Sequence, residues 1–218
     1  MRIVLLGPPG GGKGTQAVGL AKEQGIVHVA TGDLFRTEIA AGTTLGKLAD
    51  EYISHGNLVP DEVVNELMRS RLSRADCDGF LLDGYPRTLP QAESLEIILH
   101  ELGRPIHVAL NIDVPDDAIV ERAVGRLLCP DCGAIYHLTS KPPKLIGVCD
   151  VCRGQLVTRS DDQPSTVRHR LSVYHRLTQP VLEFYRERGL LRSVNGQGSR
   201  EEVGARLRQQ LQDLPQGC

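Results

Sequence analysis

The sequence predicts an α/β fold in three layers, in which helices flank a five-stranded parallel sheet on both faces. Short apolar runs typical of buried strands recur along the chain, and stretches with helical periodicity separate them. The first of these runs opens directly into a glycine-rich turn, as expected where a parallel sheet binds a ligand at the carboxyl ends of its strands. The expected strands cover residues 3–6, 26–29, 80–82, 108–112 and 190–194.

Length and composition bound the function. The 218 residues are enough for one well-packed core that carries smaller insertions. The formal net charge is -2, and aromatic residues make up 4% without any tryptophan, so neither a basic surface nor a base-stacking platform for nucleic acid is expected. No apolar run reaches the length of a membrane span, and Met1 leads into a strand rather than a signal peptide. We therefore expect a cytoplasmic protein without membrane or nucleic-acid partners.

The first expected strand ends in the stretch Gly7-Pro8-Pro9-Gly10-Gly11-Gly12-Lys13-Gly14-Thr15. A turn of this kind that enters a helix at Lys13 leaves backbone N–H groups without carbonyl partners, and they point into one concavity that suits a phosphate chain. Its glycines remove the side chains that would hold phosphate oxygens away, and Lys13 supplies a point charge. The alternative is an ordinary strand-to-helix turn. In the general P-loop a Ser or Thr directly follows the lysine, whereas here Gly14 precedes Thr15.

Two regions interrupt the alternation of strands and helices. Residues 30–59 predict two short helices, over 34–41 and 45–55, each ended by a glycine. Residues 125–162 have little helical signal, several prolines and glycines, and four cysteines. We expect both regions to be insertions that cover the carboxyl ends of the strands. The core then consists of residues 1–29, 60–124 and 163–218.

Polar residues suited to phosphate chemistry lie at the start of the first insertion and after the third expected strand. Thr31 is expected to cap the helix that follows it, a role compatible with contacting a base, while Arg36 reaches a phosphate. Asp83 ends a strand beside the glycine loop, where a carboxylate is placed to hold the waters of a magnesium ion. The alternative for Asp83 is a turn or helix-capping carboxylate. Arg87 is expected near the transferred phosphoryl group.

Four of the six cysteines form two Cys-x-x-Cys pairs that are separated by sixteen residues. Two such turns present four thiolates, which complete a closed tetrahedral zinc site without an open position for substrate or water. The alternatives are a redox pair or four unconnected thiols. A structural zinc is expected, because the lobe is too small to be held by its own core. The expected ligands are Cys129, Cys132, Cys149 and Cys152.

A zinc lobe also raises a second class of function, the binding of nucleic acid. Few basic residues lie between the cysteine pairs, which argues against it. Arginines lie instead on both sides of the cysteine lobe in the sequence, at what we call its roots. Solvated arginines on helix faces are one explanation, but phosphoryl transfer calls for cations around the spread equatorial oxygens of the phosphoryl group. These arginines are Arg122 and Arg126 before the lobe and Arg159, Arg168 and Arg170 after it.

The glycine loop, read as Gly-Pro-Pro-Gly-x-Gly-Lys-Gly-Thr-Gln, resembles that of the adenylate kinase family of nucleoside monophosphate kinases. The cysteine lobe resembles the zinc-bearing long lid of many bacterial members. Gly11 stands where Ala is more familiar, and Tyr85 stands where Phe is more usual. The resemblance covers nearly the whole chain in order. Its further motifs are Thr31 with Arg36, Asn57 to Pro60, Gly84 to Arg87, Gln91, Ile135 to His137 and Ser140 to Lys144.

The resemblance implies reversible phosphoryl transfer from MgATP to AMP, giving two ADP, by in-line transfer with closure of two lobes and a role in adenine nucleotide balance. Residues 30–59 would bind the monophosphate and residues 125–162 would form the lid. Mg²⁺ with ATP and a structural Zn²⁺ are the implied metals; ATP, AMP and ADP are the implied partners of a monomer. The alternatives are a kinase for another monophosphate, CMP or UMP, and a zinc-ribbon P-loop NTPase that binds nucleic acid.

The same resemblance implies a role for each site residue. The implied catalytic residues are Lys13, Asp83, Arg87, Arg122, Arg126, Arg159 and Arg170. The implied ATP-binding residues are Gly10, Gly11, Gly12, Lys13, Gly14, Thr15, Arg126, Ile135, Tyr136 and Gly198. The implied AMP-binding residues are Thr31, Arg36, Asn57, Leu58, Val59, Gly84, Tyr85, Pro86, Arg87, Gln91, Arg159 and Arg170. Among them Thr31, the backbone of 57–59 and Gln91 would recognise adenine, and Arg36 and Arg87 would hold the AMP phosphate.

Overall fold

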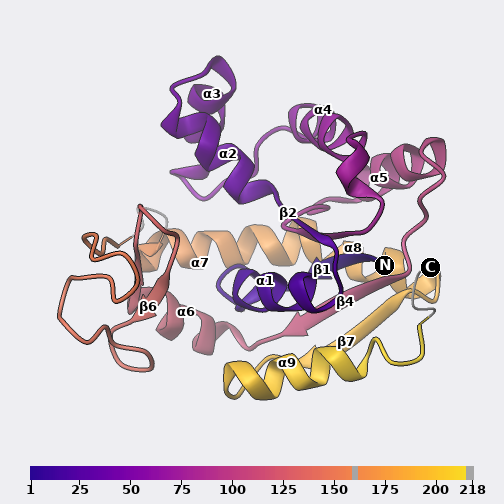
Figure 1. The fold of residues 1–218 in the computed structure, drawn as a ribbon. Coiled ribbons are helices and arrows are strands. Elements are labelled where there is room, and N and C mark those ends of the chain that lie inside the picture. Colours follow the sequence, from indigo (N-terminus) through magenta and orange to yellow (C-terminus); the bar gives the residue numbers. More distant parts are fainter. Residues whose placement is uncertain (159–161, 215–218) are drawn as a thin grey trace.

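The computed structural model describes residues 1–158 and 162–214. It confirms the predicted fold class, because five parallel strands form a central sheet with helices on both faces (Figure 1). The strands are β1 (Arg2–Leu6), β2 (Val27–Ala30), β3 (Phe80–Asp83), β4 (Val108–Asp113) and β7 (Leu191–Asn195). Each differs from the expected run by no more than one residue at either end.

The strand order β2-β3-β1-β4-β7 places the first strand in the middle of the sheet. β1 pairs with β3 so that Leu5 lies opposite Asp83, and β2 pairs with β3 so that Ala30 lies opposite the same residue. The carboxyl ends of these three strands therefore lie side by side. The segments that follow these three strands leave the sheet at the same edge, and this edge is where ligands bind in folds of this class.

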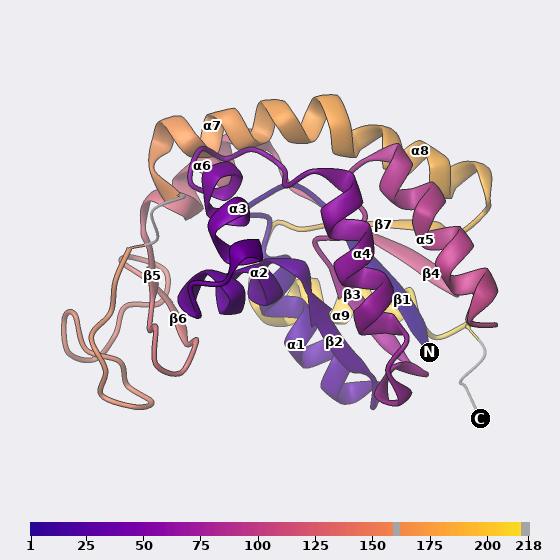
Figure 2. The ribbon, with the colours of Figure 1, turned by 90° about the horizontal axis from the view of Figure 1, so that it is seen from above.

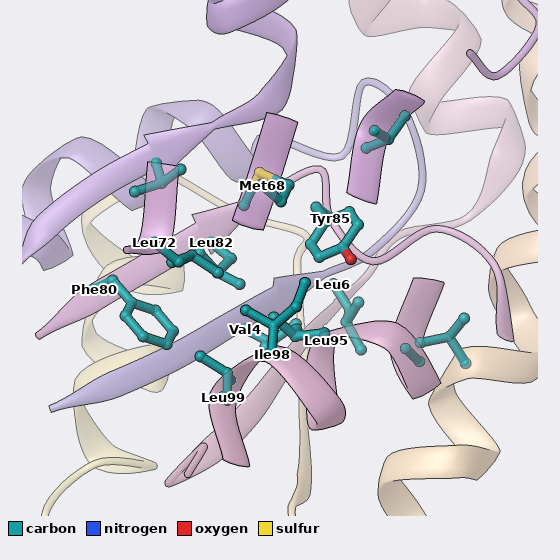
Figure 3. Packing of buried hydrophobic residues seen from close by; sticks show 14 of the residues in the cluster. Val4, Leu6, Met68, Leu72, Phe80, Leu82, Tyr85, Leu95, Ile98 and Leu99 are labelled. Atoms are coloured by element: carbon teal, nitrogen blue, oxygen red, sulfur yellow. The ribbon is translucent and has the colours of Figure 1, made fainter. Parts of the chain in front are cut away.

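One face of the sheet carries the larger apolar core. Successive side chains of a strand point to opposite faces, and Val4 and Leu6 of β1 point to this one together with Leu82 of β3. Figure 3 shows these side chains meeting those of Met68 and Leu95 from two covering helices. The helices that cover this face are α4 (Asp61–Leu72), α5 (Leu89–Glu101) and α8 (Gln179–Glu187).

The opposite face is covered by the helix that follows the glycine loop. Ile3 and Leu5 of β1 point to this face and are fully or almost fully buried. Ile119 and Leu207 pack with them from two further helices. The helices that cover this face are α1 (Lys13–Glu23), α6 (Asp116–Val124) and α9 (Arg200–Gln209), joined by part of α7 (Pro164–Val173).

Two short helices, α2 (Thr31–Ala40) and α3 (Thr44–Ile53), rise above the sheet between β2 and α4 (Figure 1). They pack closely because Gly46 has no side chain: a Cβ there would lie 2.1 Å from the carbonyl oxygen of Glu38. The prediction that Thr31 caps α2 is wrong. Ala30 is the N-cap residue and no side chain caps the helix, because the Thr31 hydroxyl donates instead to the carbonyl oxygen of Gly84, at 2.8 Å.

The cysteine-rich segment forms a separate small lobe beside the sheet (Figure 1). Its strands β5 (Arg126–Leu128) and β6 (Ile135–His137) pair antiparallel, and isolated bridges join the loops that follow. In the described part of this lobe the buried apolar cluster consists of Cys129, Tyr136, Cys149 and Leu156. An apolar core of this size is too small to stabilise the lobe by burial alone.

A long helical rod connects the lobe to the far end of the sheet (Figure 2). It consists of α7, a π-helical turn labelled η3 (Tyr174–Thr178), and α8. The Thr178 hydroxyl at the end of η3 donates to the carbonyl oxygen of Arg87, at 2.8 Å. The rod is therefore tied to the segment that follows β3. A short 3-10 turn, η1 (Ala75–Cys77), precedes β3.

Within the part of the chain that the structure describes, every helix is too short or too polar to cross a lipid bilayer. The division into a core and two insertions stays a prediction.

Candidate active site

The glycine loop, residues 7–12, connects β1 to α1. Gly10 and Gly12 have φ angles of 79° and 89°, a left-handed conformation that favours glycine. A Cβ on Gly10 would lie 2.9 Å from Ile119, whereas Gly12 faces open space. Gly12 is also the N-cap of α1, and no side chain caps the first N–H groups of that helix. The loop therefore presents an open concavity at a helix N-terminus, which is a site for a phosphate chain.

The Lys13 side chain folds back over this loop. Its Nζ donates to the carbonyl oxygens of Gly7 at 2.7 Å and Pro8 at 2.8 Å. Burial lowers the pKa of Lys13 to about 8; the Asp83 carboxylate opposes that change, and the positive charges of nearby arginines add to it. These arginines are Arg87, Arg170 and Arg126. Three of the predicted catalytic arginines thus act electrostatically on the predicted catalytic lysine.

Asp83 ends β3 directly beside the glycine loop. A Cβ on Gly14 would lie 3.5 Å from Asp83 Oδ2, so the glycine that interrupts the general P-loop pattern faces this carboxylate. Burial disfavours the charged carboxylate, but the adjacent His28 ring and the Lys13 charge outweigh it, and the pKa of Asp83 lies below its usual range. His28 Nε2 lies 3.6 Å from Asp83 Oδ2. Sequence reasoning missed His28, which is two residues before the end of β2.

The segment after Asp83 is shaped around Gly84, whose φ angle is 79°. A Cβ on Gly84 would lie 2.8 Å from Arg87 Nη2 and 2.9 Å from the Thr31 hydroxyl, so only glycine fits between them. Arg87 Nε donates to the Gly84 carbonyl oxygen at 2.8 Å, and the Tyr85–Pro86 peptide bond is cis. Three residues that the sequence assigns to the acceptor, Thr31, Gly84 and Arg87, therefore lie together.

Tyr85 and Gln91 are buried behind this segment. The Tyr85 hydroxyl donates to Asn65 Oδ1 at 2.7 Å and to the Gln91 carbonyl oxygen at 3.2 Å. This hydroxyl, which the more usual Phe lacks, therefore connects α4 to α5. Burial raises the pKa of the Tyr85 hydroxyl well above its usual range. The Gln91 side chain contacts the Arg87 backbone N–H and the Asp61 carboxylate. Sequence reasoning assigned no site role to Asn65 or Asp61.

The loop before α4 lies against α7. Asn57 Oδ1 is 2.8 Å from His169 Nε2, and a Cβ on Gly56 would lie 3.0 Å from Arg170 Cγ. Val59 is buried, and Leu58 is partly exposed. The structure therefore brings the predicted adenine-contacting loop next to a predicted catalytic arginine. Arg36 lies apart from this contact, in an exposed ion pair with Asp33 on its own helix.

Two of the arginines that flank the lobe in the sequence lie beside the glycine loop. Arg126 and Arg170 line the same hollow as Pro9 and Gly10. Arg126 Nη2 is 3.0 Å from the buried carboxylate of Asp162, and Arg122 Nη2 donates to the Gly196 carbonyl oxygen at 3.3 Å. The predicted catalytic residue Arg159 lies outside the described residues.

Three further predicted ATP contacts lie in two places, Gly198 before α9 and Ile135 and Tyr136 on β6. Gly198, with a φ angle of 112°, immediately precedes α9, whose N-terminus has the capping box formed by Ser199 and Glu202. Tyr136 directs its side chain into the core of the lobe, where its hydroxyl accepts from the Asp150 N–H at 2.8 Å. Ile135 is 39% exposed. The Tyr136 ring is therefore part of the core of the lobe, and the predicted nucleotide contact at this residue stays a prediction.

The four cysteines of the lobe converge on one point. Their Sγ atoms all lie within 4.8 Å of one another, and the pairs Cys129–Cys152 and Cys132–Cys149 are 3.3 and 3.5 Å apart. Sulfurs that coordinate one zinc ion at about 2.3 Å in a tetrahedron are roughly 3.8 Å apart. The donor set and its spacing therefore fit a tetrahedral Zn²⁺. Cys77 is buried elsewhere, with Arg71 Nη1 at 2.8 Å from its sulfur.

Comparison with known proteins agrees with this geometry. A family model described as adenylate kinase matches residues 5–190. An adenylate kinase of Symbiobacterium thermophilum is 53% identical over 210 residues, which cover 96% of this chain and 97% of the relative. Adenylate kinases of Geobacillus sp. and Caldicellulosiruptor saccharolyticus are 52% and 50% identical over 215 residues, which cover 98% of this chain and 100% and 99% of the relatives. The chain therefore belongs to the adenylate kinase family.

Proposed function

We propose that this protein transfers the terminal phosphoryl group of MgATP to AMP, reversibly and in line, to give two ADP. The observation that carries the proposal is the arrangement around Lys13. The glycine loop and the Gly84–Arg87 segment follow neighbouring strands, and Arg87, Arg126 and Arg170 lie close enough to lower the pKa of the Lys13 ammonium group. A triphosphate site and a second anion site at one sheet edge suit a donor and an acceptor nucleotide.

The donor half uses the concavity of the glycine loop. Backbone N–H groups from Gly10 to Thr15 would bind the phosphates of ATP, and Lys13 would exchange its two loop carbonyls for phosphate oxygens. Asp83 would hold the waters of the magnesium ion that accompanies ATP, and its lowered pKa keeps it ionised at neutral pH. Magnesium bound with ATP neutralises part of the charge on the phosphates.

The acceptor half uses the surfaces that face the glycine loop. Arg87 and Arg36 would hold the AMP phosphate, and Thr31, the backbone of 57–59 and Gln91 would bind its base. Arg87 is well placed for this role, since its backbone is fixed on both sides by Gln91 and Thr178 and its guanidinium donates to Gly84. Fixed donors accelerate transfer because they need no reorganisation when charge develops in the transition state.

Closure of two lobes would complete the site. We propose residues 30–59 as the monophosphate-binding lobe and 125–162 as the lid, around a core of 1–29, 60–124 and 163–218. Arg126 at the lid root and Arg170 on α7 line the hollow at Gly10, so movement of the lid would bring cations onto the phosphoryl group. Arg122 and Arg159 belong to the same proposal. Closure would expel the water that hydrolyses ATP.

The zinc site has a structural role in this proposal. Cys129, Cys132, Cys149 and Cys152 would fill all four ligand positions of a tetrahedral ion and leave no position for substrate. The bound ion would hold the lobe together where its small apolar core does not. We further propose that the protein acts as a monomer in the cytoplasm and has no nucleic-acid partner.

The proposed activity is tested with a panel of acceptors. We expect ADP to form rapidly from MgATP and AMP, and slowly when CMP, UMP or GMP replaces AMP. Release of inorganic phosphate from ATP without an acceptor should be lower than transfer to AMP by a factor on the order of 100 or more, because closure excludes water. Coupled assays of ADP and phosphate measure both rates. Fast hydrolysis without AMP would indicate an NTPase instead, and preference for another monophosphate would change the acceptor.

Replacing Lys13 tests the donor site. We expect Lys13→Ala to lower kcat by about 100-fold or more, because a buried charge that stabilises the transferred phosphoryl group is lost. Lys22→Ala is the matched control, since Lys22 is an exposed lysine on the same helix and should leave kcat within about twofold. Steady-state kinetics and thermal unfolding of both variants measure the effects. Equal activity in the two variants would remove Lys13 from the site.

The pKa of Lys13 predicts a pH dependence of ATP binding. Below about pH 8 the free protein already carries the ammonium group that binds phosphate, so binding needs no proton. Above this pH the free protein loses that proton and must take it up again on binding, and the Kd for MgATP should rise by up to about tenfold per pH unit. Calorimetric titration between pH 7 and 10 measures it. Lys13→Arg stays charged throughout, so the same rise in that variant would contradict the assignment.

Removal of the metal tests the lid. We expect about one zinc per chain in protein purified without chelator, and a chelator should lower the Tm on the order of 5–10 °C, because metal binding supplies the folding free energy of the lobe. Cys132→Ser should lose the metal and show the lower Tm from the start, while Cys77→Ser should keep the metal, since Cys77 lies outside the cluster. Elemental analysis and calorimetry measure both. Full zinc content in Cys132→Ser would refute the four-cysteine site.

A further inference from the structure

A buried hydrogen-bonded set surrounds the side chain of Gln91, which is 2% exposed. Gln91 Oε1 accepts from the Arg87 backbone N–H at 2.7 Å, and Gln91 Nε2 donates to Asp61 Oδ1 at 2.7 Å. The second oxygen of Asp61 accepts from the Thr88 hydroxyl at 2.8 Å. Asp61 is the first residue of α4, and the other groups lie in residues 87–91, which lead into α5. Two stretches of backbone that are far apart in the sequence therefore meet at one amide.

The chemistry of the two partners allows only one orientation of this amide. A backbone N–H can only donate, and a carboxylate can only accept. If the amide were turned over, its oxygen would face Asp61 Oδ1 and its NH₂ group would face the Arg87 N–H. Both contacts would be repulsive. The Arg87 N–H and the Asp61 carboxylate would each lose a hydrogen-bond partner, which would destabilise the folded protein. The orientation follows from the identity of the neighbours rather than from the shape of the amide.

Both partners are themselves held in place. The Thr88 hydroxyl donates to Asp61 and accepts from the Gln91 backbone N–H at 3.2 Å, so the side chain that caps α5 also holds the Asp61 carboxylate. The Arg87 carbonyl oxygen, in the next peptide group, accepts from the Thr178 hydroxyl at 2.8 Å, which holds the backbone of Arg87 against the long rod. The orienting groups are thus as fixed as the amide.

We propose that Asp61 is a positioning residue for base selection: it fixes the Gln91 amide in the orientation that suits adenine. This inference rests on the proposed function. With its two contacts made, the amide keeps one N–H on Nε2 and one lone pair on Oε1. Adenine presents an amino donor beside a ring-nitrogen acceptor, which pairs with this arrangement. Hypoxanthine carries a carbonyl oxygen in place of that amino group, so the oxygen would face Gln91 Oε1 without a hydrogen bond.

The test compares AMP with inosine monophosphate as acceptors. In Asp61→Asn the new side chain both donates and accepts, so it no longer dictates which end of the Gln91 amide it contacts. We expect the ratio of kcat/KM for AMP to that for inosine monophosphate to fall by about tenfold, roughly the effect of one mismatched hydrogen bond. The KM for ATP should stay within about twofold, because Asp61 acts on the acceptor base only.

Glu62→Gln is the matched control. It removes a negative charge from the same first turn of α4, but Glu62 is exposed, so the ratio should not change. Asp61→Ser is a second variant for the case that Asp61→Asn does not fold: it fits the same space, lacks the carboxylate, and should lower the ratio in the same direction. Thermal unfolding is measured for each variant.

The outcomes separate the inference from the function on which it rests. An unchanged ratio in folded Asp61→Asn and Asp61→Ser overturns the inference, and so does an equal loss for AMP, inosine monophosphate and ATP together with a lower Tm, which would indicate a purely structural role. Both leave the proposed function intact when the wild-type protein phosphorylates AMP. A wild-type protein that does not use AMP overturns the proposed function first, and the inference with it.

Discussion

The pairing of β1 with β3 is the constraint on which the candidate site depends. Because the strands are parallel and Leu5 lies opposite Asp83, the glycine loop and the Gly84–Arg87 segment leave the sheet next to each other. The addition of β2 on the other side of β3 brings Thr31 to the same edge. Residues from three distant parts of the chain are thus placed by backbone hydrogen bonds before any side chain contributes. A slip of register would separate the donor loop from the acceptor segment.

An excess of positive charge at this edge is the second constraint. Burial, and to a smaller extent three nearby arginines, make the Lys13 ammonium group less stable than in water, while the Asp83 carboxylate opposes them. A phosphate chain would add negative charge beside this ammonium group. The sheet beneath, whose β1 side chains are almost fully buried, stabilises the fold and so offsets the electrostatic repulsion among these positive charges. The free protein is therefore organised for a polyanion.

The strands and the convergence of the cysteines were predictable because each depends on a local pattern: an apolar run, or two Cys-x-x-Cys turns. Most of the phosphate-site residues could be named for the same reason, since they lie in short motifs. The contacts made by Thr31 were not predictable. A threonine before a helix predicts a cap, whereas its hydroxyl contacts Gly84, 53 residues away. The roles of Asp61 and Thr178 likewise depend on contacts across 30 and 91 residues, and no local pattern encodes such contacts.

The two parts of the proposed acceptor site differ in rigidity, and this difference fits their tasks. Gln91 is buried, and its amide lies between a neighbour that can only donate, the Arg87 N–H, and one that can only accept, the Asp61 carboxylate. In the proposed site it can therefore discriminate between bases without first being ordered. Arg36 is 43% exposed and forms an ion pair with Asp33 of its own helix, and an exposed pair of this kind contributes little stability. In the proposed function its guanidinium would exchange that carboxylate for a phosphate at little cost when the lobe closes. Base recognition by Gln91 would then need no prior ordering, whereas phosphate recognition by Arg36 would accompany closure.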